Sequence, residues 1–232
     1  MPEMESMDCT ASSSVASDRV GVMSTARIEA FSDGVFAIVV TLLVLDIRLP
    51  PVAGPDVSAS LRRSMLAMSP LFLSYALSFG LVCIWWVAHH HFFALLTRSS
   101  RTLLWLNCLF LFWLAFLPFP TALLGNYPSQ TTAVMCYGGV MTLAGASFST
   151  MRYYAFFVAE LIDSRIDRRL LKKATLKSVL NPVLHLAAML LAFVDTRIAI
   201  TLYVLIPLTF VRPSRLEKGT FSRSGAEVHR RP

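Results

Sequence analysis

The chain has 232 residues, of which 55% are hydrophobic and only 15% are charged, and its mean hydropathy is +0.60. Soluble domains carry about a quarter charged residues, so the composition excludes a soluble globular domain, a disordered chain and a coiled coil. The net charge of +7 is interpreted as the basic flanks of membrane helices, and not as a nucleic-acid surface.

Residues 1–25 are rich in serine and lack the basic and then apolar order of a secretory signal peptide, so we expect a disordered cytoplasmic tail. Six apolar stretches follow, of which the first four have about the length that a helix needs to cross a bilayer and the last two are short. The predicted fold class is therefore all-α, a polytopic membrane protein with six transmembrane helices over residues 26–212, before a basic cytoplasmic tail at 213–232. The six stretches are Ala30–Ile47, Pro70–Phe92, Leu103–Leu124, Thr131–Phe157, Val179–Val194 and Ile198–Phe210.

Two of the connections between the stretches contain residues that predict turns. Residues 49–56 contain a Pro-Pro pair and predict a turn and loop, and Asp195-Thr196-Arg197 predicts a tight hairpin between the last two stretches. Cys83, Cys108 and Cys136 lie within apolar stretches without CxxC spacing, so we expect small core residues and not disulfides or a metal site.

Positive charges are distributed unevenly over the connecting segments. With the N-terminus in the cytoplasm, 17 of the 21 Lys and Arg residues fall on the cytoplasmic side. Cytoplasmic loops are enriched in these residues, so both termini are predicted to be cytoplasmic, which requires an even number of spans. The basic segment 165–177 is interpreted as an anchor of this kind, with binding of anionic lipid or another chain as the alternative.

An ionisable side chain at membrane depth is costly and needs a partner or a role, and Asp33 is the first candidate. If the helix begins near Arg27, Asp33 lies about 9 Å inside it. A buried or hydrogen-bonded partner is then expected. The alternative is a helix cap at Ser32 or Asp33, which would shorten the span to about 21 Å.

The second candidate is the run Trp85-Trp86-Val87-Ala88-His89-His90-His91 at the end of the second stretch. Trp85 shares a helical face with His89, and Trp86 shares one with His90. The run lies at the depth of Asp33, so an Asp–His contact between the first two helices is plausible. Three consecutive histidines point in three directions on a helix, so one metal ion is not expected to bind all three.

Polar groups elsewhere give weaker signals. Asn107 in the third stretch is expected to tie helices together. The sequence contains no Ser/His/Asp set, no HExxH motif and no glycine-rich phosphate loop, so neither an enzyme nor a bound cofactor is expected.

The first stretch carries a stripe at alternating spacings of four and three, which is typical of a helix that packs against a copy of itself. Ser32 and Asp33 are rotated away from Ile38 by about 120–140° and face other helices. An apolar stripe alone more often indicates packing than a pore. The stripe comprises Arg27, Phe31, Gly34, Ile38, Thr41 and Leu45, with Leu42 beside it.

Arg27-x-x-x-Phe31-Ser32-Asp33, followed by the apolar run 35–47, resembles the first helix of the transmembrane-protein-175 family, the potassium channels of bacteria and endolysosomes. R-x-x-x-F-S-D is that family's hallmark. Softer similarity in residues 72–79, 85–90 and 107–121 extends the resemblance over roughly residues 26–212, although His91 lengthens the histidine pair to three.

The resemblance implies a homotetramer of six-helix subunits in the plasma membrane, with four copies of the first helix around a central path for K⁺. The family has no TVGYG filter. Its constriction corresponds to rings of Ile38, Leu42 and Leu45, with the hydroxyl of Thr41 beside them. The inter-helix network behind the pore would comprise Arg27, Phe31, Ser32, Asp33, Trp85 or Trp86, His89 or His90, and Asn107.

An apolar constriction costs a cation part of its hydration shell and closes by dewetting, so a modest preference for K⁺ over Na⁺ is expected. The alternatives from other classes are a secondary transporter, for which the sequence shows no internal repeat, and a membrane-embedded protein acting on lipid. A lipid-acting protein would use the histidine run as its catalyst, and the sequence shows no evident nucleophile at the same depth.

Overall fold

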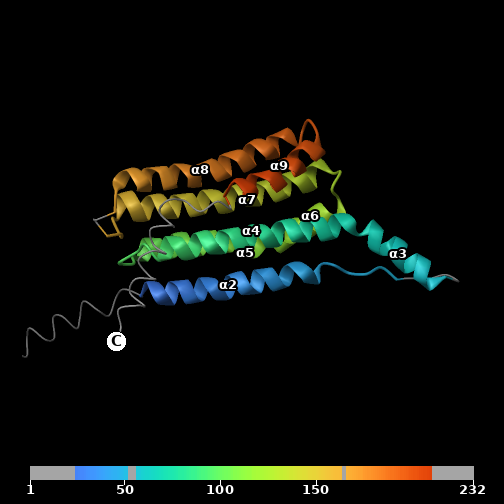
Figure 1. Cartoon of the computed structure of the whole chain (residues 1–232), viewed down its shortest axis with the longest axis horizontal. Helices are drawn as coiled ribbons and strands as arrows, with labels where there is room; N and C mark the ends of the chain where they lie inside the picture. The colour runs from blue at the N-terminus through green and yellow to red at the C-terminus, as the bar shows by residue number, and fades with distance from the viewer. Residues whose placement is uncertain (1–23, 52–55, 164–165, 211–232) are drawn as a thin grey trace, which may run out of the picture.

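The computed structural model describes residues 24–51, 56–163 and 166–210, and all regular elements in this part of the chain are helical (Figure 1). Apart from Ser24 and Thr25, the two predicted tails lie outside the described residues. The helices are α2 (Thr25–Leu45), α3 (Val57–Ala67), α4 (Ser69–Phe93), α5 (Arg101–Phe116), α6 (Pro118–Asn126), α7 (Thr131–Tyr153), α8 (Arg168–Leu191) and α9 (Thr196–Phe210), with one π-helical turn, η1 (Tyr154–Val158), after α7.

Four helical segments in the described part of the chain are long and apolar enough to cross a membrane: Thr25–Leu45, Ser69–Phe93, Arg101–Asn126 and Arg168–Leu191. The third comprises α5 and α6, which meet at Leu117 just before Pro118. α7 has 23 residues but contains several Gly, Ser and Thr residues, which lower its hydropathy. α9 is apolar and shorter. The all-helical prediction is therefore confirmed, while the count of six spans stays a prediction.

Three local predictions need correction. The segment after the predicted loop 49–56 forms a further helix, α3, which Asp56 caps by accepting a hydrogen bond from the backbone N–H of Ala59 at 3.0 Å. Most of the basic segment 165–177 is the first half of α8 and not a separate linker, because Asp167 caps a helix that continues into the apolar stretch. Cys83 and Cys108 are exposed on the bundle surface and are not core residues.

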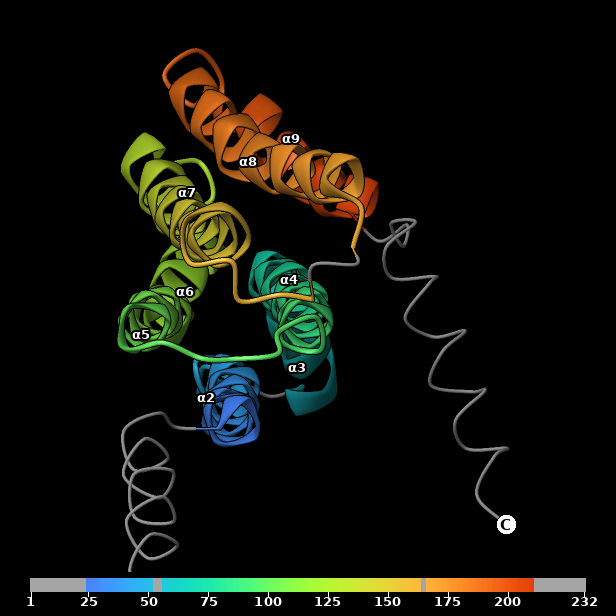
Figure 2. The ribbon, with the colours of Figure 1, turned by 90° about the vertical axis from the view of Figure 1, so that its left-hand side faces the viewer.

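α2 packs against both α4 and α5, at one side of the bundle (Figure 2). The α8–α9 pair forms the predicted hairpin and packs on α7 at the opposite side. The chain runs back and forth along one axis, so the start of α2, the end of α4 and the start of α8 lie at the same end of the bundle (Figure 1). This places the N-terminal half of α2 beside the histidine run of α4.

Small residues let α7 approach its neighbours closely. A Cβ added at Gly138 would collide with the hydroxyl of Tyr203 on α9, and one at Gly145 would come within 2.9 Å of Asn181 Oδ1 on α8. Pro182 has no N–H for the carbonyl of Ser178 one turn earlier. The hydroxyl of Ser149 lies 2.8 Å from that carbonyl and also 2.8 Å from the carbonyl of Gly145, so its single proton is shared between the two acceptors.

Candidate functional site: two faces of the first helix

The two faces of α2 differ in burial. Its core face is closed by Ile28, Ser32, Phe36, Val39 and Leu43, all buried against α4 and α5. The opposite face has no neighbour in the described chain. The helix begins at Thr25, so Asp33 lies two turns inside it, and the alternative in which Ser32 or Asp33 caps a helix beginning at Gly34 is wrong.

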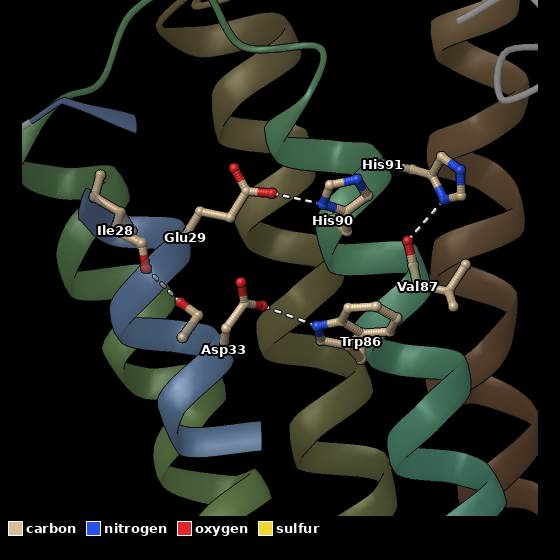
Figure 3. A network of polar contacts seen from close by, with 8 residues as sticks. Ile28, Glu29, Asp33, Trp86, Val87, His90 and His91 are labelled. Carbon is tan, nitrogen blue, oxygen red and sulfur yellow. Dashed lines mark hydrogen bonds and ion pairs between the residues drawn. The ribbon is translucent and has the colours of Figure 1, made fainter. Parts of the chain in front are cut away.

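Two side chains of α2 contact α4 along one edge of the interface (Figure 3). The indole Nε1–H of Trp86 donates to Asp33 Oδ1 at 2.8 Å, and His90 Nδ1 lies 2.6 Å from Glu29 Oε1. Because α2 and α4 are antiparallel, residues four apart on one helix meet residues four apart on the other. The indole of Trp86 also stacks on the imidazole of His90, with ring centroids 6.2 Å apart. Each of the two contacts therefore helps to orient the side chain that makes the other.

A second polar chain joins α2, α5 and α4 inside the bundle. Asn107 Nδ2 donates to Ser32 Oγ at 2.9 Å, and Asn107 Oδ1 lies 2.9 Å from His89 Nε2. The Ser32 hydroxyl in turn donates to the carbonyl of Ile28 at 2.8 Å. An amide oxygen only accepts, so this arrangement places the proton of the neutral imidazole on Nε2. The three side chains are 0–1% exposed, so their hydrogen bonds are sheltered from solvent.

Aromatic rings hold His89 in this orientation. Its ring stacks on Phe93 with centroids 4.4 Å apart and lies edge-on to Phe36 at 5.5 Å. The neighbouring Trp85 is buried and packs edge-to-face on Phe110 at 5.8 Å. Trp85 therefore contributes packing, while the hydrogen bond to Asp33 comes from Trp86.

The expected Asp–His contact is not formed. Asp33 contacts Trp86, and the histidine nearest this edge, His90, contacts Glu29. The third histidine, His91, turns back to the carbonyl of Val87 at 2.7 Å. The three rings thus have three different partners, and no group of three or more His, Cys, Asp or Glu residues among those described could hold a metal ion.

Arg27 and Phe31 point away from both polar chains. Both are exposed, Phe31 by 60%, and within the described residues the Arg27 side chain has no hydrogen-bond or ion-pair partner. They lie on the stripe that also carries the predicted pore residues. Any role in a network therefore requires a partner outside the described residues.

The outward face of α2 is apolar with one hydroxyl. Ile38 is 58% exposed, Leu42 40% and Leu45 63%, and Thr41 is exposed beside them. The Thr41 hydroxyl donates to the carbonyl of Ile38 at 2.8 Å. This fixes its proton on the helix side and leaves the oxygen lone pairs facing outward as acceptors.

Comparison with known proteins connects this arrangement to a family. Residues 27–118 match the family model described as "Endosomal/lysosomal potassium channel TMEM175". A potassium channel of Chamaesiphon minutus is 35% identical over 179 residues, which is 76% of this chain and 88% of the relative. The chain belongs to the TMEM175 family. The match to the family model contains α2 from Arg27 onward together with α4 and α5, and therefore both polar chains.

A crystal structure and a human relative extend the comparison. The crystal structure of a homologue from Chamaesiphon minutus, described as a lysosomal potassium-selective channel homologue, has a TM-score of 0.70 at 32% identity and covers 81% of this chain and 96% of that one. The human protein named endosomal/lysosomal proton channel TMEM175 is 45% identical over 101 residues, 41% of this chain and 20% of the human protein. This TMEM175 chain is therefore a membrane protein of a channel family.

Glu29 takes part in the site but is not among the predicted site residues, although the sequence contains a signal for it. Glu29 precedes Asp33 by one helical turn, just as Trp86 precedes His90. Two acceptors and two donors at matching i, i+4 spacings on neighbouring antiparallel helices predict two contacts. Considering Asp33 alone concealed this pairing.

Proposed function

We propose that the protein is a potassium-selective cation channel, a homotetramer in which four copies of α2 surround the ion path. One observation supports this most directly, namely that none of the described residues covers the face of α2 opposite the core. It carries Ile38, Leu42 and Leu45, with Thr41 as its hydroxyl. Four such faces around an axis form an apolar constriction, and the names of the bacterial relatives point to K⁺ as the permeant ion.

Dehydration sets the selectivity of such a constriction. A cation that passes rings of aliphatic side chains loses part of its hydration shell, and K⁺ holds its water less tightly than Na⁺. Acceptor lone pairs on Thr41, whose proton is held by the carbonyl of Ile38, replace some of that water. Because no ring of carbonyls surrounds the ion, the preference for K⁺ is modest.

The two polar chains hold α2 at a fixed distance and rotation relative to α4 and α5. The Asp33–Trp86 and Glu29–His90 contacts fix one flank, and the Ser32–Asn107–His89 chain fixes the other. A rotation of α2 that moved Ile38 would break contacts on both flanks. The network therefore sets the pore width without lining the pore.

The proposed subunit crosses the plasma membrane six times, through α2, α4, α5 with α6, α7, α8 and α9, with residues 26–212 as the channel domain. Among the described residues, most Lys and Arg residues belong to the start of α2, the α4–α5 connection, the end of α7 and the start of α8, which meet at one end of the bundle. By the distribution of positive charge this end faces the cytoplasm, and both tails are expected on the same side. Membrane lipid surrounds the tetramer.

Purified protein in K⁺-loaded liposomes tests the proposal. The wild-type protein is expected to pass K⁺ with a bi-ionic reversal potential that favours K⁺ over Na⁺, and Ile38→Asn is expected to raise the relative Na⁺ permeability. Leu205→Asn, an equally drastic change on the exposed surface of α9, is the matched control. An unchanged reversal potential in Ile38→Asn would refute the constriction.

The same liposomes separate the other classes. Saturable, gradient-coupled flux without single-channel currents would indicate a secondary transporter, and release of lipid products would indicate a lipid-acting protein. A pH-sensitive dye inside the vesicles reports proton flux, which the name of the human relative makes a necessary measurement.

A further inference from the structure

The basic first half of α8 offers a surface that the channel function does not use. α8 lies at the side of the bundle opposite α2, so in the proposed tetramer it is remote from the ion path (Figure 2). From its geometry we propose that α8 binds an anionic phospholipid of the leaflet at the end of the bundle where α2 begins. The phosphate would bind at Arg169, Lys172 and Lys173.

One helical face carries the three cations and an apolar strip directly after them. At about 100° per residue, Arg169, Lys172 and Lys173 span the same sector as Leu176 and Val183. The three cations are exposed, Leu176 is 71% exposed and Val183 is 53% exposed. Val179, Leu180 and Leu190 continue the strip, each between 42% and 54% exposed.

Charge neutralisation within the chain is incomplete on this face. Arg168 is paired with Glu160 at 2.6 Å, and Asp167 accepts the backbone N–H of Arg169 at 2.8 Å as the helix cap. Among the described residues, the side chains of Arg169, Lys172 and Lys173 have no hydrogen-bond or ion-pair partner. Three adjacent cations therefore remain available to an anion.

Depth favours a lipid over a soluble partner. At about 1.5 Å per residue, α8 extends about 27 Å from Lys173 to Leu191, close to the thickness of the hydrocarbon layer. The cations therefore lie at the level of the headgroups, and the strip from Leu176 to Leu190 lies along the acyl chains. A nucleic acid or acidic protein would contact the cations but would leave the apolar strip unused.

Native mass spectrometry of the full chain in uncharged detergent tests the proposal, with dioleoyl phosphatidylglycerol and dioleoyl phosphatidylcholine as probes. Each basic residue near an anionic surface contributes about fivefold to binding. Lys172→Gln/Lys173→Gln is therefore expected to weaken phosphatidylglycerol binding on the order of 30-fold and to leave phosphatidylcholine binding unchanged. Lys172→Arg/Lys173→Arg should retain binding.

Arg62→Gln/Arg63→Gln is the matched control, because it removes two exposed charges from α3 at the other end of the bundle. It should leave phosphatidylglycerol binding intact. Equal losses in the α8 and α3 variants, or equal binding of both lipids by wild type, would overturn the proposal. Complete displacement of phosphatidylglycerol by 50 mM inorganic phosphate would also overturn it, because it would show a bare anion site. The readout needs no ion flux, so it fails or succeeds independently of the channel function.

Discussion

Asn107 is the residue on which the buried polar chain depends, and Asn107→Leu tests that dependence at nearly constant volume. The amide donates to Ser32 on α2 and faces the Nε2–H of His89 on α4. Replacing it removes both inter-helix contacts at once. Ser32 retains its own bond to the carbonyl of Ile28, whereas His89 is left with a buried donor that has no acceptor.

The magnitude follows from these contacts. Hydrogen bonds between membrane helices contribute about 0.6 kcal/mol each, and an orphaned buried donor costs about 1–3 kcal/mol. Asn107→Leu should therefore destabilise the protein by about 2–4 kcal/mol. His89→Phe alone orphans the amide oxygen instead. The double variant removes both halves of the mismatch, so it should cost no more than Asn107→Leu alone.

Equilibrium unfolding by SDS in bicelles, followed by tryptophan fluorescence, measures all four proteins of this double-mutant cycle. We expect a coupling free energy of at least about 1 kcal/mol between the two positions. Trp105→Phe, an exposed position on the same helix as Asn107, controls for general effects of substitution in α5. Additive single costs, with coupling below about 0.5 kcal/mol, would refute the hydrogen bond between Asn107 and His89.

Two further predictions concern the edge contacts and the packing of α7. Asp33→Asn weakens the charge-assisted hydrogen bond from Trp86. It should lower the yield of tetramer in size-exclusion chromatography, or the K⁺ flux, while the K⁺/Na⁺ permeability ratio stays constant. Normal assembly with a changed permeability ratio would place Asp33 in the pore. Gly138→Ala drives a methyl group into the Tyr203 hydroxyl and should cost about 1–3 kcal/mol in SDS unfolding. Gly139→Ala, whose Cβ would lie 3.8 Å from Met189 Sδ, should be neutral within about 0.5 kcal/mol, and equal costs for the two would contradict the close α7–α9 contact.

Hydropathy predicted the helices well because a bilayer forces backbone polar groups to pair within one segment. The apolar stretches therefore had to be helical, and their order gave the back-and-forth path. α3 was missed because its 11 residues are too few for a span and its start depends on one capping side chain, Asp56. The start of α8 was placed too late because basic side chains were taken to end the helix, although lysine and arginine favour helical backbone.

At the site, sequence spacing identified the interacting helices but could not choose between neighbours. Trp85 and Trp86 differ by about 100° around α4, and only the rotation of α4 decides which of them reaches Asp33. That rotation is set by burial of Trp85 against Phe110 on α5 and of His89 against Phe36 on α2. These are contacts between distant parts of the chain, and no local pattern encodes them.

Different faces of α2 meet two requirements, to hold the helix in position and to line the proposed ion path. Side chains that specify its position, such as Ser32 and Asp33, bind other helices of the same subunit. Side chains that would meet the ion in the proposed pore, such as Ile38 and Leu45, are exposed in the part of the subunit that the structure describes. In the proposed pore, a substitution on the first face would move the lining, whereas one on the second face would change its chemistry. Selectivity and assembly should therefore respond to different substitutions on α2. If one residue both lined the pore and held the helix in place, a single substitution would change both properties.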